Sequence, residues 1–124
     1  LLYVLIYLCI LLLQFFLHYF CNLIILSFSD IDRSLSSDKP VVIGILHRGS
    51  LSNPTGGHML CVIGKSDDGK SYICNDPYGS LNDGYTGPVI NGKGVRYSVE
   101  VLKYRWLEKG KDKTGWGRIF DTKK

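Results

Sequence analysis

The chain has 124 residues, with 15 lysine or arginine and 11 aspartate or glutamate side chains and a formal net charge of +4. This length leaves room for one domain and excludes a multidomain assembly within the chain. The positive charge gathers in residues 93–124 without the interleaved aromatic side chains that nucleic-acid recognition uses, so no nucleic-acid partner is expected.

Residues 1–29 contain no charged side chain and no glycine. About 20 mostly apolar residues are enough to cross a membrane, so this segment is predicted to be a separate apolar helix and a membrane anchor. The alternative is a misread upstream segment, because the chain begins with Leu1 and not with methionine. A membrane location is therefore expected only if residues 1–29 are a genuine part of the protein.

The next segments predict the start of a folded domain. Residues 30–39 are polar and rich in serine, which indicates a linker before a domain over residues 40–124. Residues 41–46 form a continuous apolar run, typical of a strand that is buried on both faces. Residues 47–55 contain glycine, asparagine and proline, which favours a loop.

A β-hairpin is predicted from two further apolar runs, residues 58–64 and 71–76. The polar segment between them contains an Asp-Gly pair, which favours a tight connection. Glycine and proline are frequent in residues 77–94, which predicts a long loop of the kind that commonly surrounds a site.

The last elements complete an α+β arrangement. Ser98 is a suitable N-cap for a helix over residues 99–109, because its side chain can accept a hydrogen bond from the first turn. Residues 116–120 are predicted to form a short closing strand. The order of elements predicts one helix that covers a small antiparallel sheet.

His58 and Asp76 stand at the open end of the predicted hairpin. If paired residue numbers sum to 134 or 136, the imidazole and the carboxylate share a face and lie within contact. A sum of 135 instead sets Cys61 opposite Cys74 and sends His58 and Asp76 to opposite faces. The even register is favoured, and it brings together a general base and the carboxylate that orients it. The structural alternative is a strand-edge histidine beside a turn aspartate.

No cysteine of the chain is expected to act as the nucleophile for this pair. In a regular strand Cys61 points away from the face of His58, and Cys74 lies about 13 Å further along the hairpin. Cys9 and Cys21 fall in the apolar segment and are interpreted as lipid-facing or core residues. The spacing of the cysteines and histidines matches no zinc motif, so no metal and no cofactor is expected.

These motifs resemble a known family over residues 40–120. The main elements are Gly57-His58 before an apolar strand and Asn75-Asp76-Pro77 after the next one, with weaker aromatic matches at Tyr97 and Trp106. They resemble the C-terminal half of papain-like cysteine peptidases in the bacteriocin-processing, peptidase family C-thirty-nine-like group. The resemblance implies a partial papain-like fold.

The resemblance also implies roles for individual residues. His58 would take a proton from a catalytic cysteine, and Asp76 would orient the imidazole. Gly57 permits a close approach of a substrate beside the histidine, so Gly57 and Tyr78 are candidate substrate-binding residues.

The expected function is that of a partial hydrolase. The cysteine of this family, and the glutamine that helps to stabilise the oxyanion, precede the matched region, where this chain has the apolar segment and the predicted linker. We therefore expect the C-terminal half of a cysteine peptidase-like enzyme, directed at a peptide or protein substrate and inactive as this fragment. The alternative is a non-catalytic, membrane-tethered binding module that uses the loop over residues 78–94 as its contact surface.

Overall fold

A computed structural model describes residues 4–9, 24–107 and 115–120. Residues 4–9 are helical, and within the described ranges no helix is both long and apolar enough to cross a membrane. Residues 10–23, which make up the middle of the predicted apolar helix, lie outside the described part. The prediction of a helix up to residue 29 is wrong at its end, because residues 24–26 form a strand of the main sheet.

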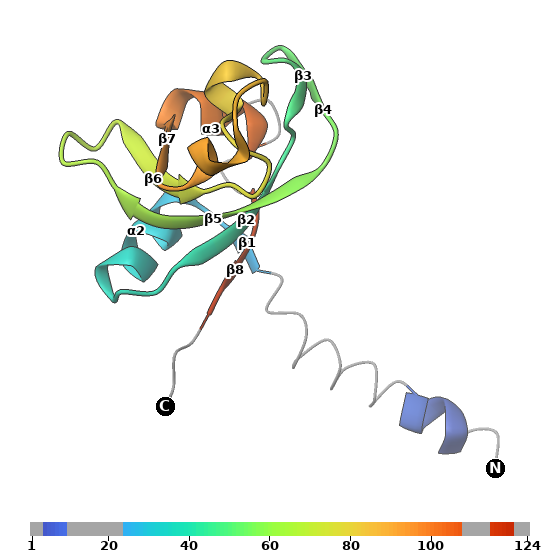
Figure 1. Cartoon of the computed structure of the whole chain (residues 1–124). Coiled ribbons are helices and arrows are strands. Elements are labelled where there is room, and N and C mark those ends of the chain that lie inside the picture. The colour runs from blue at the N-terminus through green and yellow to red at the C-terminus, as the bar shows by residue number, and fades with distance from the viewer. Residues whose placement is uncertain (1–3, 10–23, 108–114, 121–124) are drawn as a thin grey trace.

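The main sheet has six strands, and every pair in it is antiparallel. Its two central strands, β2 and β5, pair along five residues, so His58 starts a strand in the middle of the sheet. Figure 1 shows this sheet with its strands labelled. The strands follow one another across the sheet as β1 (Ile24–Leu26), β8 (Gly115–Ile119), β2 (Val41–Ile45), β5 (His58–Lys65), β6 (Ser71–Asn75) and β7 (Val95–Ser98).

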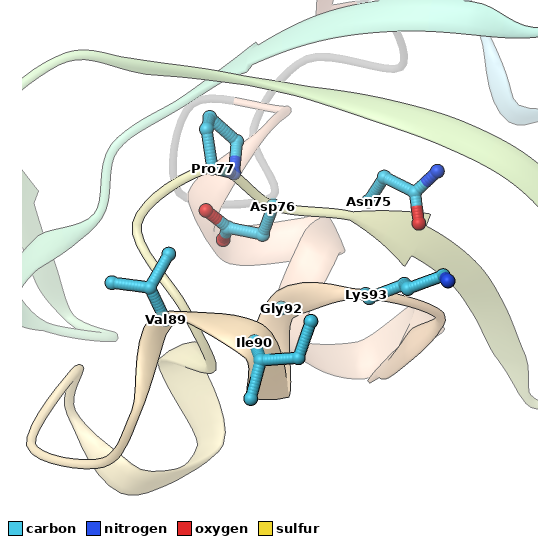
Figure 2. Close-up of a pocket in the computed structure, with 7 residues that line it drawn as sticks. All are labelled: Asn75, Asp76, Pro77, Val89, Ile90, Gly92 and Lys93. Carbon is cyan, nitrogen blue, oxygen red and sulfur yellow. The ribbon is translucent and has the colours of Figure 1, made fainter.

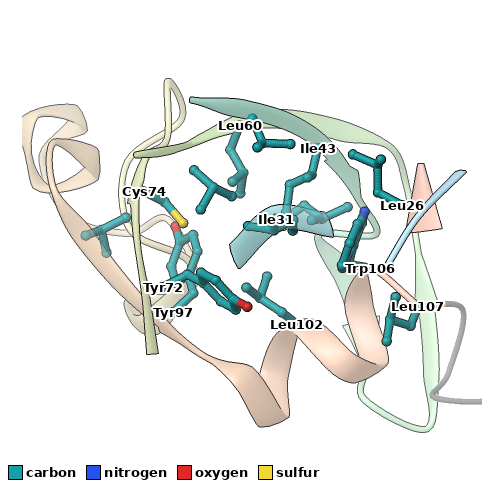
Figure 3. Packing of buried hydrophobic residues seen from close by; sticks show 14 residues of the cluster. Leu26, Ile31, Ile43, Leu60, Tyr72, Cys74, Tyr97, Leu102, Trp106 and Leu107 are labelled. Carbon is teal, nitrogen blue, oxygen red and sulfur yellow. The ribbon is translucent and has the colours of Figure 1, made fainter. Parts of the chain in front are cut away.

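Helices α2 (Phe28–Ser36) and α3 (Val99–Arg105) both contribute to one hydrophobic core. The side chains of Ile31 and Leu102 are fully buried in it, together with the inward-facing residues of β2, β5, β6 and β7 (Figure 3). The ring of Phe28 stacks on Tyr72 and meets Trp106 edge-on. The α+β class is as predicted. Within the described residues, two helices pack against the sheet, whereas one was predicted.

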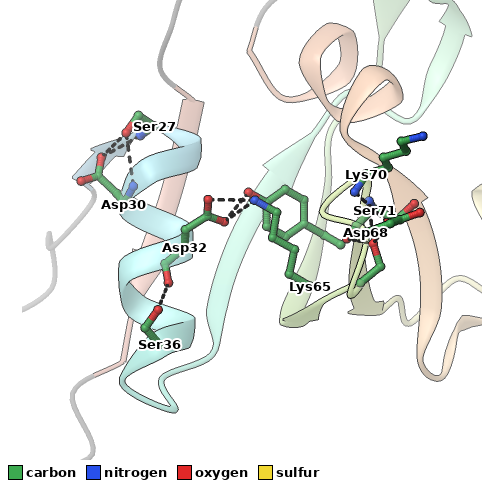
Figure 4. A network of polar contacts seen from close by, with 10 residues as sticks. Ser27, Asp30, Asp32, Ser36, Lys65, Asp68, Lys70 and Ser71 are labelled. Carbon is green, nitrogen blue, oxygen red and sulfur yellow. Dashed lines mark hydrogen bonds and ion pairs between the residues drawn. The ribbon is translucent and has the colours of Figure 1, made fainter.

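The segment that was predicted to be a linker forms helix α2. Ser27 accepts a hydrogen bond from the Asp30 backbone N–H, and the Asp30 carboxylate accepts one from the Ser27 N–H, so the helix starts with a capping box (Figure 4). The hydrogen bonds from Ser27 lower the pKa of Asp30. The partly exposed side chain of Asp32 accepts hydrogen bonds from the Tyr72 hydroxyl and the Lys65 ammonium. The serines and aspartates of this segment therefore serve as caps and contacts of a short helix.

The β5–β6 hairpin combines an irregular strand with a four-residue turn. The turn is closed by the Ser66 and Ser71 backbones across residues 67–70. Near the turn, Gly64 pairs with Ile73, and beyond it Val62 pairs with Cys74, so Ile63 is an extra residue that forms a β-bulge. Beyond the bulge the paired numbers sum to 136, which is the even register that was favoured.

Several loops contain more structure than their composition indicates. Residues 47–55 form a small hairpin of strands β3 (Arg48–Ser50) and β4 (Asn53–Thr55), where a plain loop was predicted. The long loop contains two 3-10 turns, η1 (Leu81–Asp83) and η2 (Val89–Gly92), and is followed by strand β7, which the sequence analysis did not predict.

The final predicted elements are present with different limits. Ser98 accepts a hydrogen bond from the Val101 N–H and caps α3 as predicted, but the helix ends at Arg105 instead of residue 109. The closing strand is present as β8, which lies between β1 and β2. Strand β2 is fully buried on one face only, although its apolar run predicts burial on both.

Candidate functional site

His58 and Asp76 form a buried hydrogen-bonded pair. The distance between His58 Nε2 and Asp76 Oδ1 is 2.6 Å. His58 is 8% exposed and Asp76 is 4% exposed. His58 is the first residue of β5 and Asp76 follows the last residue of β6, so the hairpin register brings them together. The predicted contact between these two side chains is confirmed.

The Asp76 carboxylate accepts four hydrogen bonds. Oδ1 accepts from His58 Nε2 and, at 2.9 Å, from the Tyr78 backbone N–H. Oδ2 accepts from the hydroxyl of Tyr97 at 2.6 Å and from that of Tyr85 at 2.9 Å. Burial raises the pKa of Asp76, but the hydrogen bonds from Tyr97, His58, Tyr78 and Tyr85 together outweigh burial and hold it below its ordinary value. Asp76 is therefore held in its charged form.

The contact with Asp76 distinguishes the two ring nitrogens of His58. Because the ionised carboxylate can only accept hydrogen bonds, Nε2 must carry a proton in this contact. Nδ1 has no hydrogen-bond partner within the described residues. In the neutral ring Nδ1 therefore holds the lone pair that can take a proton from another group.

Aromatic rings surround the His58 imidazole. The ring of Tyr78 lies parallel to it at a centroid distance of 3.9 Å, although Tyr78 itself is 53% exposed. The rings of His47 and Tyr85 meet it edge-on at 5.4 and 6.0 Å. These contacts fix the plane of the imidazole and leave Tyr78 as the group between it and solvent.

His47 is a second histidine, and its ring lies beside that of His58. Its Nδ1 is buried and has no hydrogen-bond partner in the described part of the chain. Burial lowers the pKa of His47, and the electrostatic effects of His58, Arg48 and Arg105 act in the same direction, while Asp76 opposes them. The guanidinium of Arg105 is itself bound to the backbone carbonyls of Leu46, Arg48 and Gly49. His47 is therefore favoured in its neutral form.

Two adjoining hollows lie beside the pair and share Pro77 and Val89. One has a volume of about 470 Å³ and lies between the segment Asn75–Pro77 and the turn η2, with Ile90 and Lys93 at its edge (Figure 2). The other has a volume of about 590 Å³ and is lined by His47, Arg48, Tyr78 and Tyr85. The two hollows give an extended molecule room to lie beside the pair.

The turn η2 is packed directly on the backbone of Asp76. The Asp76 N–H donates to the Gly92 carbonyl at 2.8 Å. A Cβ on Gly92 would overlap the Asp76 carbonyl oxygen and would come within 2.7 Å of the Gly79 carbonyl oxygen. Glycine is therefore required at this position for the loop to close on the carboxylate.

The two candidate substrate-binding residues differ in their surroundings. Tyr78 lines the larger hollow and covers His58. Gly57 is exposed, and a Cβ at that position would meet no atom within 4 Å other than those of its chain neighbours. Gly57 does not line either hollow.

The cysteines of the hairpin are free and do not face each other. Cys61 pairs with Asn75, and Cys74 pairs with Val62 in the core. Burial raises the pKa of Cys61, and burial followed by the charge of Asp76 raises that of Cys74 to about 12. Both thiols are thus disfavoured as thiolates, which are the reactive form.

The remaining cysteines make no hydrogen bond to His58 in the described part of the chain. Cys9 is exposed in the helix over residues 4–9, and Cys21 lies outside the described residues. Within those residues, no group of three or more histidine, cysteine or acidic side chains is placed to hold a metal ion.

Three residues of the site were not identified from the sequence. Tyr97 belongs to β7, an unpredicted strand, and Tyr85 belongs to a loop whose path no local pattern defines. His47 belongs to the segment over residues 47–55 that was predicted to be a plain loop. The alternation of Val95 and Tyr97 as inward-facing residues was the available signal for β7.

Comparison with known proteins identifies a family for this chain. The model of the Peptidase_C39 like family matches residues 15–114. No curated protein and no solved structure matches the chain. The match includes β1 and α2, which lie before the region that carries the motif resemblance. Since the family model covers most of its length, the chain belongs to the Peptidase_C39 like family and contains a cysteine peptidase-like domain.

Proposed function

We propose that this chain supplies the base and the orienting carboxylate of a cysteine peptidase-like site that hydrolyses peptide or amide bonds. The observation that carries the proposal is the 2.6 Å contact between His58 Nε2 and Asp76 Oδ1, which leaves Nδ1 without a partner among the described residues. Family membership supports a peptide or protein as the substrate.

In this mechanism His58 Nδ1 takes the proton of a thiol, and the thiolate attacks the carbonyl carbon of the scissile bond. Asp76 keeps Nε2 protonated and stabilises the positive charge that develops on the imidazole. The imidazolium then returns its proton to the leaving amine, which leaves the acyl group on the sulfur as a thioester. Water then gives a proton to His58 Nδ1 and attacks the thioester, which releases the carboxylic acid, and the proton returns to the thiol. Tyr78, which stacks on the His58 ring, and Gly57, which precedes His58 in the chain, would contact the substrate.

The described residues hold no thiol suited to this role, so we propose that the chain is inactive without an added nucleophile. The test joins a helical segment with the glutamine and cysteine of a family member in front of residue 24. Cleavage of a defined peptide mixture is followed by mass spectrometry. We expect no cleavage by the unmodified chain and clear cleavage by the joined protein.

His58→Ala should reduce cleavage by the joined protein by roughly 10³-fold or more, as for removal of a base that acts with its nucleophile as one unit. Substitution of the added cysteine by serine should have the same effect. A folded joined protein whose activity does not depend on His58 would contradict the proposal. Cleavage by the unmodified chain that is lost in Cys21→Ser would instead show that the nucleophile is already present.

A second candidate function is a non-catalytic binding module. It is favoured by the exposure of apolar side chains on the long loop, since Val89 and Ile90 are 63% and 69% exposed beside the smaller hollow. In that case the joined protein would remain inactive, while Ile90→Ser would weaken capture of the partner. Membrane tethering through residues 1–29 remains a proposal, tested by partition of the full chain between lipid vesicles and buffer.

A further inference from the structure

The two oxygens of the Asp76 carboxylate have separate partners. A free carboxylate can rotate about its Cβ–Cγ bond, and only one of its oxygens faces His58. Oδ1 binds His58 Nε2, whereas Oδ2 receives the hydroxyls of Tyr97 and Tyr85 at 2.6 and 2.9 Å. Donors on both oxygens fix the plane of the group, because rotation would break the contacts on either side.

We propose that Tyr97 and Tyr85 are positioning residues, whose hydroxyls hold Asp76 Oδ2 so that Oδ1 stays on His58 Nε2. The inference rests on the proposed function, since it concerns the orientation of the same pair. It assigns a role to two side chains that come from different elements and that do not touch His58 through a hydrogen bond.

Tyr97 is the fixed partner of Asp76. It lies in β7, its side chain is fully buried, and its hydroxyl also accepts a hydrogen bond from the Leu81 N–H at 2.9 Å. The second acceptor near its hydroxyl, the Gly79 carbonyl, is more distant, at 3.3 Å. Since a hydroxyl has one proton, the shorter contact with Asp76 takes it.

Tyr85 is held in a backbone conformation that side chains rarely adopt. Its φ is 63°, in the left-handed region that favours glycine or asparagine. Its N–H donates to the Ser80 carbonyl at 2.9 Å, which stabilises this conformation. Neither glycine nor asparagine could extend a hydroxyl to Asp76 from this position. The strained backbone is therefore explained by the contact that the side chain makes.

Both tyrosines stay protonated where the site would operate. Burial, followed by the interaction with the Asp76 carboxylate, raises the pKa of each hydroxyl well above its ordinary value. Tyr85 also lines the larger hollow with His47 and Arg48. Tyr85 thus lines the hollow in which a substrate would lie and also donates a hydrogen bond to the carboxylate that orients the base.

The test uses the full chain and requires no catalysis. Tyr97→Phe, Tyr85→Phe and the double variant remove the hydroxyls and keep the rings. In each variant, ¹³C NMR measures the titration of the Asp76 carboxyl, and ¹⁵N NMR at neutral pH measures the protonation of the two His58 nitrogens. We expect the pKa of Asp76 to rise in each single variant and further in the double one. We also expect faster solvent exchange of the Nε2 proton.

Tyr72→Phe is the matched control, because Tyr72 is another buried tyrosine whose hydroxyl binds a carboxylate, that of Asp32 at 2.7 Å. It should lower stability without changing the Asp76 or His58 signals. Unchanged signals in Tyr85→Phe and in the double variant would overturn the inference. Should Tyr97→Phe not fold, Tyr85→Phe alone decides. An inactive joined protein would contradict the proposed function and leave these NMR results valid.

Discussion

Asp76 connects four groups that come from a segment between His58 and Tyr97. Its side chain is fully enclosed, and every donor around it depends on the same negative charge. In a buried network of this kind, loss of one member leaves the other polar groups without partners. The carboxylate therefore contributes to folding as well as to the orientation of His58.

Asp76→Asn should lower the free energy of unfolding at pH 7 by roughly 2 kcal/mol or more, because hydrogen bonds to a charged group are lost. The folded state lowers the pKa of Asp76, so its stabilising contribution is complete above about pH 4 and is lost as pH falls through the folded-state pKa. Urea unfolding between pH 3 and 7 should show the wild-type protein and the variant converging in acid.

Asp67→Asn, in the turn of the hairpin, is the control and should change stability little at any pH. A difference between the wild-type protein and Asp76→Asn that stays constant down to pH 3 would contradict the role of the charge.

The sequence predicts the His58–Asp76 contact because side chains alternate between the two faces of a hairpin. Whether two residues share a face therefore depends only on the register of the two strands, which is set locally. Only a small set of registers is compatible with a hairpin of this length, and half of them place both residues on one face. Tyr85 and Tyr97 could not be predicted in this way, because they reach Asp76 through the path of a long loop and the pairing of β7 with β6. Contacts of that kind depend on tertiary structure.

At the level of elements, the turn η2 is as important to the site as the strands. It carries Val89 and Ile90 at the smaller hollow, and its Gly92 touches the backbone of Asp76. A loop that is rich in glycine and proline can be ordered when glycine is needed for a close approach. Here the close approach occurs between the loop and the residue that binds His58.

Gly92→Ala should destabilise the protein by about 1–3 kcal/mol or more, because the added methyl group overlaps the Asp76 and Gly79 carbonyl oxygens. The Nε2 proton resonance of His58 should broaden or shift in the same variant. Thermal unfolding and NMR measure the two effects. Gly57→Ala is the matched control, since its methyl group would meet open space. Equal effects of the two substitutions would contradict this account of Gly92.

Two elements were missed because their local patterns are weak. Helix α2 has nine residues, most of them polar. The serine and aspartate of its capping box are residue types that also occur in linkers. Strand β7 has four residues, and its last residue, Ser98, is also the N-cap of α3. Both elements depend on tertiary contacts, because Ile31 of α2 and Tyr97 of β7 are buried in the hydrophobic core.

For the molecule as a whole, the folded domain begins earlier than residue 40. Strand β1 pairs with β8, and α2 packs against β5 and β2, so residues 24–39 belong to the same core as the hairpin. The predicted boundary at residue 40 therefore differs from the structure. The α+β class and the hairpin could be predicted, because they follow from apolar periodicity and turn residues. The strand order could not, since β8 pairs with strands from the start of the domain.

A chain of residues 40–124 should fail to unfold cooperatively, whereas residues 24–124 should unfold in a single transition. The shorter chain lacks the buried side chains of Leu26 and Ile31, each worth roughly 2–4 kcal/mol in a core, and this loss is comparable to the stability of a small domain. Circular dichroism during heating measures the transition.

Single substitutions in the longer chain provide the control. Leu26→Ala should lower its stability by roughly 2–4 kcal/mol, and Ile25→Ala, at a side chain that is 68% exposed, should have little effect. A cooperative transition in residues 40–124 would show that β1 and α2 are dispensable.

Because β5 contains an extra residue, Ile63, the length of the hairpin turn decides whether His58 and Asp76 lie on the same face. Next to the four-residue turn, the numbers of paired residues on the two strands sum to an odd value. Because Ile63 is an extra residue, the sum is even where the strands reach His58 and Asp76. Inserting or deleting one residue in residues 67–70 would therefore reverse the face of His58, unless the bulge disappeared at the same time. Changes of two residues would leave the pair intact. The number of residues in this turn is thus constrained to an even or odd value by the chemistry of a site at the other end of the hairpin.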